Sequence, residues 1–142
     1  MGIEENKALV RHICTLFTKG ELETAFSLFS TGYTEHSGLR EIRKKKFMQS
    51  TTLFFDSFRD VQINIEEIVA EGDRVAVRET WTAVHTGREF MGIAPTGKNI
   101  KFTNTCIFRI ADGKIAECWA TLDSLNTLQQ LGVLPPTEEI GK

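Results

Sequence analysis

In the first part of the chain, apolar residues recur at the three- and four-residue spacing of amphipathic helices. This pattern predicts helices over residues 6–18, 22–29 and about 39–58, with residues 33–36 as a short connector. Gly20 and Gly32 follow the first two apolar stripes, and glycine commonly ends helices. The inward-facing positions are Leu9, Ile13, Leu16, Phe17, Leu22, Ala25, Phe26, Phe29, Phe47, Thr51, Phe54 and Phe58.

After these stripes the apolar period changes to two, which is typical of half-buried strands. The predicted segments are strands at about 61–66, 74–85, 99–111 and 114–122, a glycine-rich broken hairpin or flap at 86–98, and a short helix at about 125–131. Helices followed by antiparallel strands indicate an α+β fold, and the absence of βαβ alternation argues against a parallel nucleotide-binding sheet. The length predicts one domain over residues 1–134, and residues 135–142 form a loose tail.

The strongest local signal is Asp112-Gly113, which is typical of a tight β-hairpin turn. A two-residue turn would set Trp119 opposite Cys106, Thr121 opposite Asn104, and Asp123 opposite Phe102. One largely apolar face would then carry an Asn, a Thr and a carboxylate at one end. A carboxylate in an apolar wall has a raised pKa, which suits proton transfer near neutral pH. Asp123 is therefore the candidate acid/base.

Two interpretations of Asp123 stay open, because it also stands where the last strand meets the final helix, and Asp is a favoured N-cap. The other candidate site residues have similar alternatives. Asn104 and Thr121 form either a cross-strand pair or a support for Asp123 and a substrate oxygen. Trp81 and Trp119 are either core aromatics or the walls of a pocket for a flat ligand.

Tyr33 and His36 are placed either on the surface or at the mouth of that pocket, as hydrogen-bond partners of a ligand. His85 has the same strand parity as Trp81, which directs it toward the pocket end. The three histidines at positions 12, 36 and 85 lack ligand spacing, so no metal is predicted. The sequence also lacks a Gly-rich phosphate loop, HExxH, CxxC and GxSxG.

Composition narrows the class of protein. The 142 residues are 41% hydrophobic and 25% charged, as in an ordinary globular protein, and the net charge of −2 argues against a nucleic-acid binder. There is no apolar run long enough for a membrane span and no apolar signal core at the N-terminus. Three widely spaced cysteines fit a reducing, cytoplasmic setting, and the predicted register directs Cys106 and Cys118 to opposite faces.

Several segments resemble the SnoaL-like polyketide cyclase family, within the nuclear transport factor 2-like superfamily. They are YTEH at 33–36, VAVRETW at 75–81, HTG at 85–87, FMGIAPTGK at 90–98, FRIADGKIAECW at 108–119 and LQQLG at 128–132. The resemblance implies a cone-shaped α+β barrel in which three N-terminal helices pack on a curved, mostly antiparallel sheet that encloses a pocket. It also implies a homodimer.

In characterised members of this family a pocket Asp works as acid/base in an aldol ring closure, with no cofactor, and the resemblance puts that role on Asp123. Relatives often have an acidic residue at the position of Ala120 and His at the position of Cys118. The chain departs from the family pattern at both positions. The fold also serves isomerases, dehydratases, epoxide hydrolases and binding domains, so it does not decide the reaction.

Three hypotheses follow for a small hydrophobic or aromatic carbonyl ligand. The first is cofactor-free proton transfer next to a carbonyl, with Asp123 as base and Asn104, Tyr33 or His36 at the enolate oxygen. The second is a non-catalytic small-molecule binding protein in which Asp123 is only a helix cap. The third is water activation by Asp123 for hydrolysis.

Overall fold

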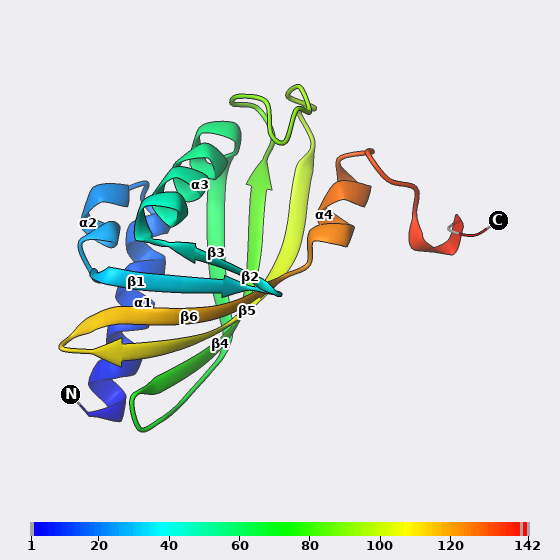
Figure 1. The fold of residues 1–142 in the computed structure, drawn as a ribbon. Helices are drawn as coiled ribbons and strands as arrows, with labels where there is room; N and C mark the ends of the chain where they lie inside the picture. The colour runs from blue at the N-terminus through cyan, green and yellow to red at the C-terminus, as the bar shows by residue number, and fades with distance from the viewer. Residues whose placement is uncertain (1, 140, 142) are drawn as a thin grey trace.

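A computed structural model describes residues 2–139 and 141 of the chain (Figure 1). The helices are α1 (Ile3–Thr18), α2 (Leu22–Phe26), α3 (Lys44–Ser57) and α4 (Ser124–Gln130), followed by a turn of 3-10 helix, η1 (Thr137–Glu139). The strands are β1 (Phe29–Ser37), β2 (Arg40–Arg43), β3 (Arg59–Glu71), β4 (Arg74–Val84), β5 (Asn99–Ala111) and β6 (Lys114–Leu122).

The six strands form one curved, unclosed sheet in the order β2-β1-β6-β5-β4-β3. β1 pairs with β6 in parallel, and every other neighbouring pair is antiparallel. Figure 1 shows α1, α2 and α3 gathered against one side of the sheet, while α4 stands at the far end of β6. The predicted α+β class, with helices packed on a curved and mostly antiparallel sheet, is confirmed.

The core fills the space between these helices and the concave face of the sheet. α1 contributes Val10, Ile13 and Phe17, which spacing of three and four residues places on one side of the helix. β4 contributes Val75 and Val77, two positions apart and fully buried. Odd-numbered residues of β4 therefore face the interior, and even-numbered residues face outward.

The predicted boundaries near the N-terminus are partly wrong. α1 ends as predicted before Gly20, whose φ of 76° lies in the left-handed region that favours glycine. The second helix, however, is only five residues long, and Phe29 begins β1 instead of continuing it. Residues 33–36, predicted as a connector, lie within β1. Residues 33–36 form a strand because β1 pairs in parallel with the distant strand β6. Local periodicity does not reveal a partner so far away in the sequence.

The predicted register of the last hairpin is also wrong beyond its turn. Ile110 pairs with Ile115 as a two-residue turn requires, but Arg109 then pairs with Glu117. Ala116 is the extra residue of a β-bulge, and a shift of one residue turns every later side chain of β6 to the other face. Trp119 therefore pairs with Ile107, and Thr121 pairs with Thr105. Cys118 and Cys106 share the concave face, and all three cysteines are free.

The segment predicted as a flap joins β4 to β5 as an irregular loop, residues 85–98, beside the C-terminal end of α3 (Figure 1). Gly87 donates its backbone N–H to the Ser57 carbonyl, and Arg88 donates to the Asp56 carbonyl, both at 2.9 Å. A Cβ at Gly87 would lie 1.9 Å from the Asp56 oxygen, so only glycine allows this approach. The loop is thus fastened to α3 through backbone atoms.

The C-terminal part of the chain forms the predicted short helix, α4, and then η1. Gln129 donates to the Pro135 carbonyl and to the Thr137 hydroxyl, which ties η1 back to α4. Positions 140 and 142 of the predicted loose tail lie outside the described residues, and the division at residue 134 stays a prediction. None of the helices that the structure describes is long and apolar enough to span a membrane.

Candidate active site

A buried carboxylate, Glu79 of β4, is the centre of the candidate site. Its side chain faces the helices with Val75 and Val77 and is 3% exposed. Three donors hold it: Trp81 Nε1 and Asn104 Nδ2 donate to Oε1 at 3.2 and 3.1 Å, and the Cys14 thiol donates to Oε2 at 3.2 Å. A buried charge needs such partners, and their directions fix the carboxylate in one orientation.

Each donor comes from a different place in the sequence. Trp81 follows Glu79 by two positions on the same face of β4, and Asn104 pairs directly with Glu79 from the neighbouring strand β5. Cys14 reaches across the interior from α1. Burial raises the pKa of the Cys14 thiol far above its ordinary range, and the neighbouring Glu79 charge adds to the rise. The thiol therefore stays protonated and acts as a donor.

A second carboxylate, Glu35 of β1, faces the same interior. The Tyr33 hydroxyl donates to Glu35 Oε1 at 3.3 Å. Burial raises the pKa of Glu35, and the Tyr33 hydrogen bond offsets part of that rise. Burial also raises the pKa of the Tyr33 phenol, so this hydroxyl keeps its proton. The protonated phenol is a hydrogen-bond donor, and the Glu35 carboxyl group accepts from it.

Two buried thiols, Cys106 of β5 and Cys118 of β6, lie on the concave face between β1 and β4. Burial and the neighbouring Cys118 thiol raise the pKa of Tyr33, and Cys118 together with burial raises the pKa of Cys106. Asn104 Nδ2 lies 3.2 Å from Cys106 Sγ as well as donating to Glu79. We call the whole set the interior polar cluster. Its members are Cys14, Tyr33, Glu35, Glu79, Trp81, Asn104, Cys106 and Cys118.

The members of the interior polar cluster differ in their exposure. Glu35, Trp81 and Asn104 are only half-buried although they face the concave side of the sheet. Leu122, at the end of β6 opposite Asn104, is 46% exposed. Two cavities of about 540 and 330 Å³ lie elsewhere, near the turns at Gly72 and Gly113 and between β4, β5 and α4. Access to Glu79 is therefore past Trp81 and Asn104.

The structure brings together three of the seven predicted site residues, Tyr33, Trp81 and Asn104. Asp123 stands outside the interior polar cluster and caps α4, where its Oδ1 accepts the Asn126 N–H at 3.2 Å. Trp119 and His36 lie on the convex face, and Thr121 is exposed. This grouping differs from the predicted one because the bulge at Ala116 turns the later side chains of β6 to the opposite face of the sheet.

Sequence reasoning missed Glu79 and Glu35, although a signal for Glu79 existed. Glu79 has the same strand parity as Val75, Val77 and Trp81, so it is a charged residue on the apolar side of a predicted strand. Within the described residues, no three His, Cys, Asp or Glu side chains are grouped as metal ligands. The arrangement offers acid/base chemistry by two carboxylates and hydrogen bonding to a substrate oxygen.

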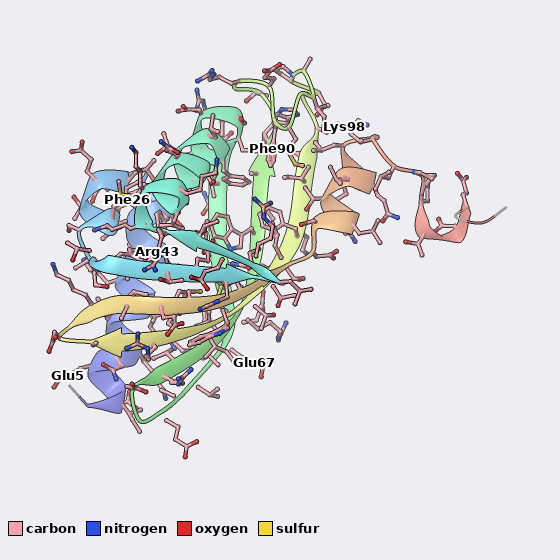
Figure 2. All side chains as sticks on the ribbon, viewed as in Figure 1. Glu5, Phe26, Arg43, Glu67, Phe90 and Lys98 are labelled. Atoms are coloured by element: carbon pink, nitrogen blue, oxygen red, sulfur yellow. The ribbon has the colours of Figure 1, made fainter. Side chains whose placement is uncertain are left out.

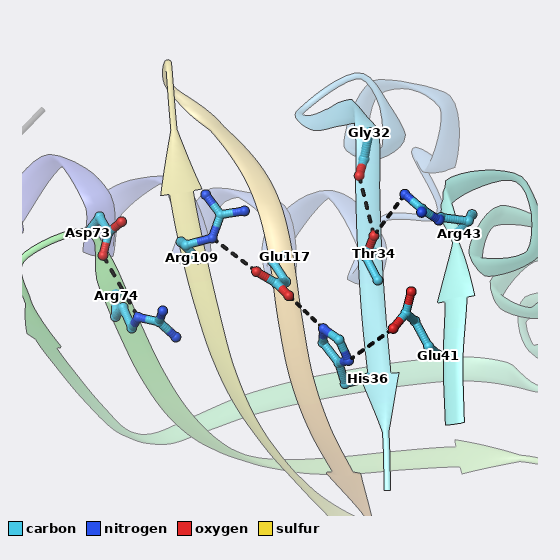
Figure 3. A network of polar contacts seen from close by, with 9 residues as sticks. All are labelled: Gly32, Thr34, His36, Glu41, Arg43, Asp73, Arg74, Arg109 and Glu117. Atoms are coloured by element: carbon cyan, nitrogen blue, oxygen red, sulfur yellow. Dashed lines mark hydrogen bonds and ion pairs between the residues drawn. The ribbon is translucent and has the colours of Figure 1, made fainter. Parts of the chain in front are cut away.

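The convex face carries a separate polar network (Figure 3). His36 Nε2 lies 2.6 Å from Glu117 Oε2, and Arg109 Nε donates to Glu117 Oε1 at 3.1 Å. The Trp119 ring stacks on His36 at 5.1 Å and receives the Arg74 guanidinium at 4.7 Å. These contacts run across β1, β6, β5 and β4, and they stabilise the outer side of the curved sheet.

This network predicts an acid-sensitive contribution to stability. The hydrogen bond with His36, with help from Arg109, lowers the pKa of Glu117 below its ordinary value of 4.5. The contribution is therefore fully present above that value and is lost as the pH falls through the lower folded pKa. We expect Glu117→Gln to cost at most about 1 kcal/mol at pH 7, and clearly less below about pH 4. Urea unfolding at both pH values measures this, and an equal cost at both would contradict it.

The model of the SnoaL-like polyketide cyclase family matches residues 7–131. AclR, a proposed hydroxylase from Streptomyces galilaeus, is 30% identical, with a TM-score of 0.91 over 98% of this chain and 88% of that protein. IdmH, a proposed polyketide cyclase from Streptomyces antibioticus, is 28% identical, with a TM-score of 0.77 over 90% of this chain and 99% of that one.

A proposed SnoaL-like polyketide cyclase from Jannaschia sp. CCS1 has the same fold, with 20% identity and a TM-score of 0.79 over 94% of this chain and 95% of its own. A comparison with curated protein sequences gives no match.

Proposed function

Because the chain belongs to the SnoaL-like polyketide cyclase family, we propose that it is a cofactor-free enzyme that moves a proton at a carbon next to a carbonyl. The substrate class is a small hydrophobic or cyclic carbonyl compound. The observation that carries the proposal is Glu79, a buried carboxylate held by three donors on the concave face of the sheet. Fixed orientation and exclusion of water are what a general base in such a reaction needs.

We assign the base to Glu79 and keep Asp123 as the competing candidate. Relatives often carry their acidic residue at the position of Ala120, which here pairs with Cys106 on the concave face. Glu79 extends into the same region from β4, one strand beyond Cys106. In this chain the carboxylate of the candidate site is thus supplied by β4 instead of β6. Asp123 is engaged as the N-cap of α4.

Glu79 Oε2 is the atom assigned to take the proton. Oε1 already accepts two N–H bonds, from Trp81 and Asn104, whereas Oε2 accepts only a weak thiol bond. The enolate oxygen that forms would be stabilised by donors on the β1 side of the interior. Tyr33 is the candidate, because burial favours the protonated form of its hydroxyl.

The proposal is tested with 2-tetralone, a bicyclic ketone whose α-protons exchange with solvent when a base removes them. We expect the protein, in D₂O with a metal chelator and no added cofactor, to accelerate α-deuteration by at least about 10²- to 10⁴-fold over heat-denatured protein. Proton NMR follows the loss of the α-proton signals. Tight binding of 2-tetralone without any acceleration would instead favour the second sequence hypothesis, a non-catalytic binding protein.

Hydroxylation is a second candidate, favoured by the 30% identity to AclR over nearly the whole chain. The two functions share the removal of a proton next to a carbonyl, because the enolate is the nucleophile that would add to dioxygen. That addition gives a hydroperoxide, and a two-electron reductant from solution would then convert it to the alcohol and water. Isotope labelling separates them. Oxygen from labelled dioxygen in the product would indicate hydroxylation, whereas label from water would indicate hydrolysis.

We also propose that the protein is a homodimer in a reducing, cytoplasmic setting. The resemblance to the family supports the dimer, and the three free cysteines support the reducing compartment. Multi-angle light scattering at two protein concentrations would test the dimer, and a single monomeric peak at both would contradict it.

A further inference from the structure

His85, the residue after the last position of β4, is 0% exposed, and one of its ring nitrogens has no partner. Its Nδ1 accepts the backbone N–H of Thr96 at 3.3 Å. A backbone N–H can only donate, so Nδ1 carries the lone pair and the neutral ring holds its hydrogen on Nε2. Among the described residues no acceptor reaches that Nε2–H.

The His85 ring lies in an aromatic wall. It stacks on Phe58 at 4.9 Å, and Phe58 in turn contacts Phe54 at 4.7 Å and Phe90 at 5.0 Å. Trp81 and Phe102, stacked at 5.6 Å, continue the wall toward Glu79. An N–H donor buried among apolar rings loses its hydrogen bond to water without replacement, which is unfavourable unless a ligand supplies an acceptor.

The loop over this wall is held by backbone hydrogen bonds at its two ends, and its tip packs on the apolar core through Phe90 and Ile93. Gly87 and Arg88 bond to the end of α3, and Gly97 and Lys98 bond to the backbone of His85. Within the described residues, the backbone hydrogen bonds of the tip, residues 90–95, are the two between Phe90 and Ile93. Phe90 is carried on this tip (Figure 2). Its ring lies 6.1 Å from that of Phe54 and 5.0 Å from that of Phe58. Moving the tip would uncover the wall without breaking the anchors.

We propose that the His85 Nε2–H is a specificity-determining donor for the carbonyl oxygen of a flat aromatic ketone bound between the aromatic wall and the loop tip. The proposal rests on the proposed function, because Glu79 and His85 belong to the same concave face. They are six positions apart, which corresponds to about 20 Å along an extended strand. His85 therefore contacts an oxygen remote from the reacting carbon.

The test uses 9-fluorenone and fluorene, two flat tricyclic molecules that differ only by the carbonyl oxygen. We expect the wild-type protein to bind fluorenone about tenfold more tightly than fluorene, as one added hydrogen bond of about 1.4 kcal/mol requires. In the His85→Asn variant, the ratio of the dissociation constants for fluorene and fluorenone should fall to about one. The shorter amide can still accept from Thr96 but does not reach the Nε2 position. Quenching of tryptophan fluorescence gives both dissociation constants.

The wild-type protein provides a second readout that needs no variant. The Hε2 resonance of His85 should move downfield with fluorenone and not with fluorene. Any one of three results would overturn the inference. They are an equal ratio of dissociation constants in the wild type and in His85→Asn, an unmoved Hε2 resonance, and no binding of either molecule. Fluorenone has no α-hydrogen, so its binding is independent of turnover. If 2-tetralone is deuterated but fluorenone does not bind more tightly than fluorene, only the role of His85 is refuted. If fluorenone binds more tightly but 2-tetralone is not deuterated, only the proposed function is refuted.

Discussion

Glu79→Gln is expected to reduce the rate of 2-tetralone deuteration by about 10²- to 10⁴-fold, the range that a general base contributes. Glutamine has nearly the same shape as glutamate. Its amide oxygen can still accept from Trp81 and Asn104, and its NH₂ group can face the Cys14 sulfur. The change therefore removes the proton acceptor and keeps the surroundings. Initial rates by proton NMR, with circular dichroism as a check of folding, give the result.

Asp123→Asn is the matched control. Asparagine is as good an N-cap as aspartate, so the variant keeps the cap on α4 while it removes the second candidate base. We expect a rate close to that of the wild type. The opposite pattern, with Asp123→Asn inactive and Glu79→Gln active, would return the acid/base role to Asp123 and refute the assignment to Glu79.

Gly87→Ala is expected to lower the free energy of unfolding by about 3 kcal/mol, the upper part of the usual range for overpacking. The new Cβ would stand 1.9 Å from the Asp56 backbone oxygen, and no flexible side chain is available to move aside. Relief requires the loop to separate from the end of α3, at the cost of the bonds from Gly87 and Arg88. Urea unfolding followed by tryptophan fluorescence measures the loss.

Gly32→Ala is the control for this prediction. A Cβ at Gly32 meets nothing within 4 Å, and the residue lies in β1, where alanine is tolerated. The expected change is within about 0.5 kcal/mol. If both variants lost the same stability, the close approach of Gly87 to α3 would not be the cause, and the loop would be less firmly attached than the structure indicates.

Much of the fold could be predicted from residue periodicity. The last two strands were predicted at the boundaries that the structure has, because a tight turn and alternating side chains are local signals. β1 was missed because its partner β6 is about eighty residues away, and short-range spacing at Phe26 and Phe29 fits a helix equally well. In such cases long-range strand pairing overrides the local helix pattern.

The candidate site was less predictable than the fold, and the reason is a single residue. The register around Asp112-Gly113 follows the turn, but a bulge depends on how the strand packs against its neighbours and has no sequence signature at Ala116. Asn104 and Trp81 were placed inside correctly because they lie on other strands. The position of Glu79 on the inner face could be predicted from strand parity, because it alternates with Val77 and Trp81.

The bulge at Ala116 also has a consequence for how this protein can change over evolution. Deletion of Ala116 would leave Glu117 opposite Arg109 and Trp119 opposite Ile107, so the later side chains of β6 would keep their faces. If the residue stayed and β6 paired with β5 without the bulge, Trp119 and Thr121 would turn inward, while Cys118 and Ala120 would move to the exterior. Descendants that straighten this strand at constant length would therefore exchange its interior side chains without any change in its sequence.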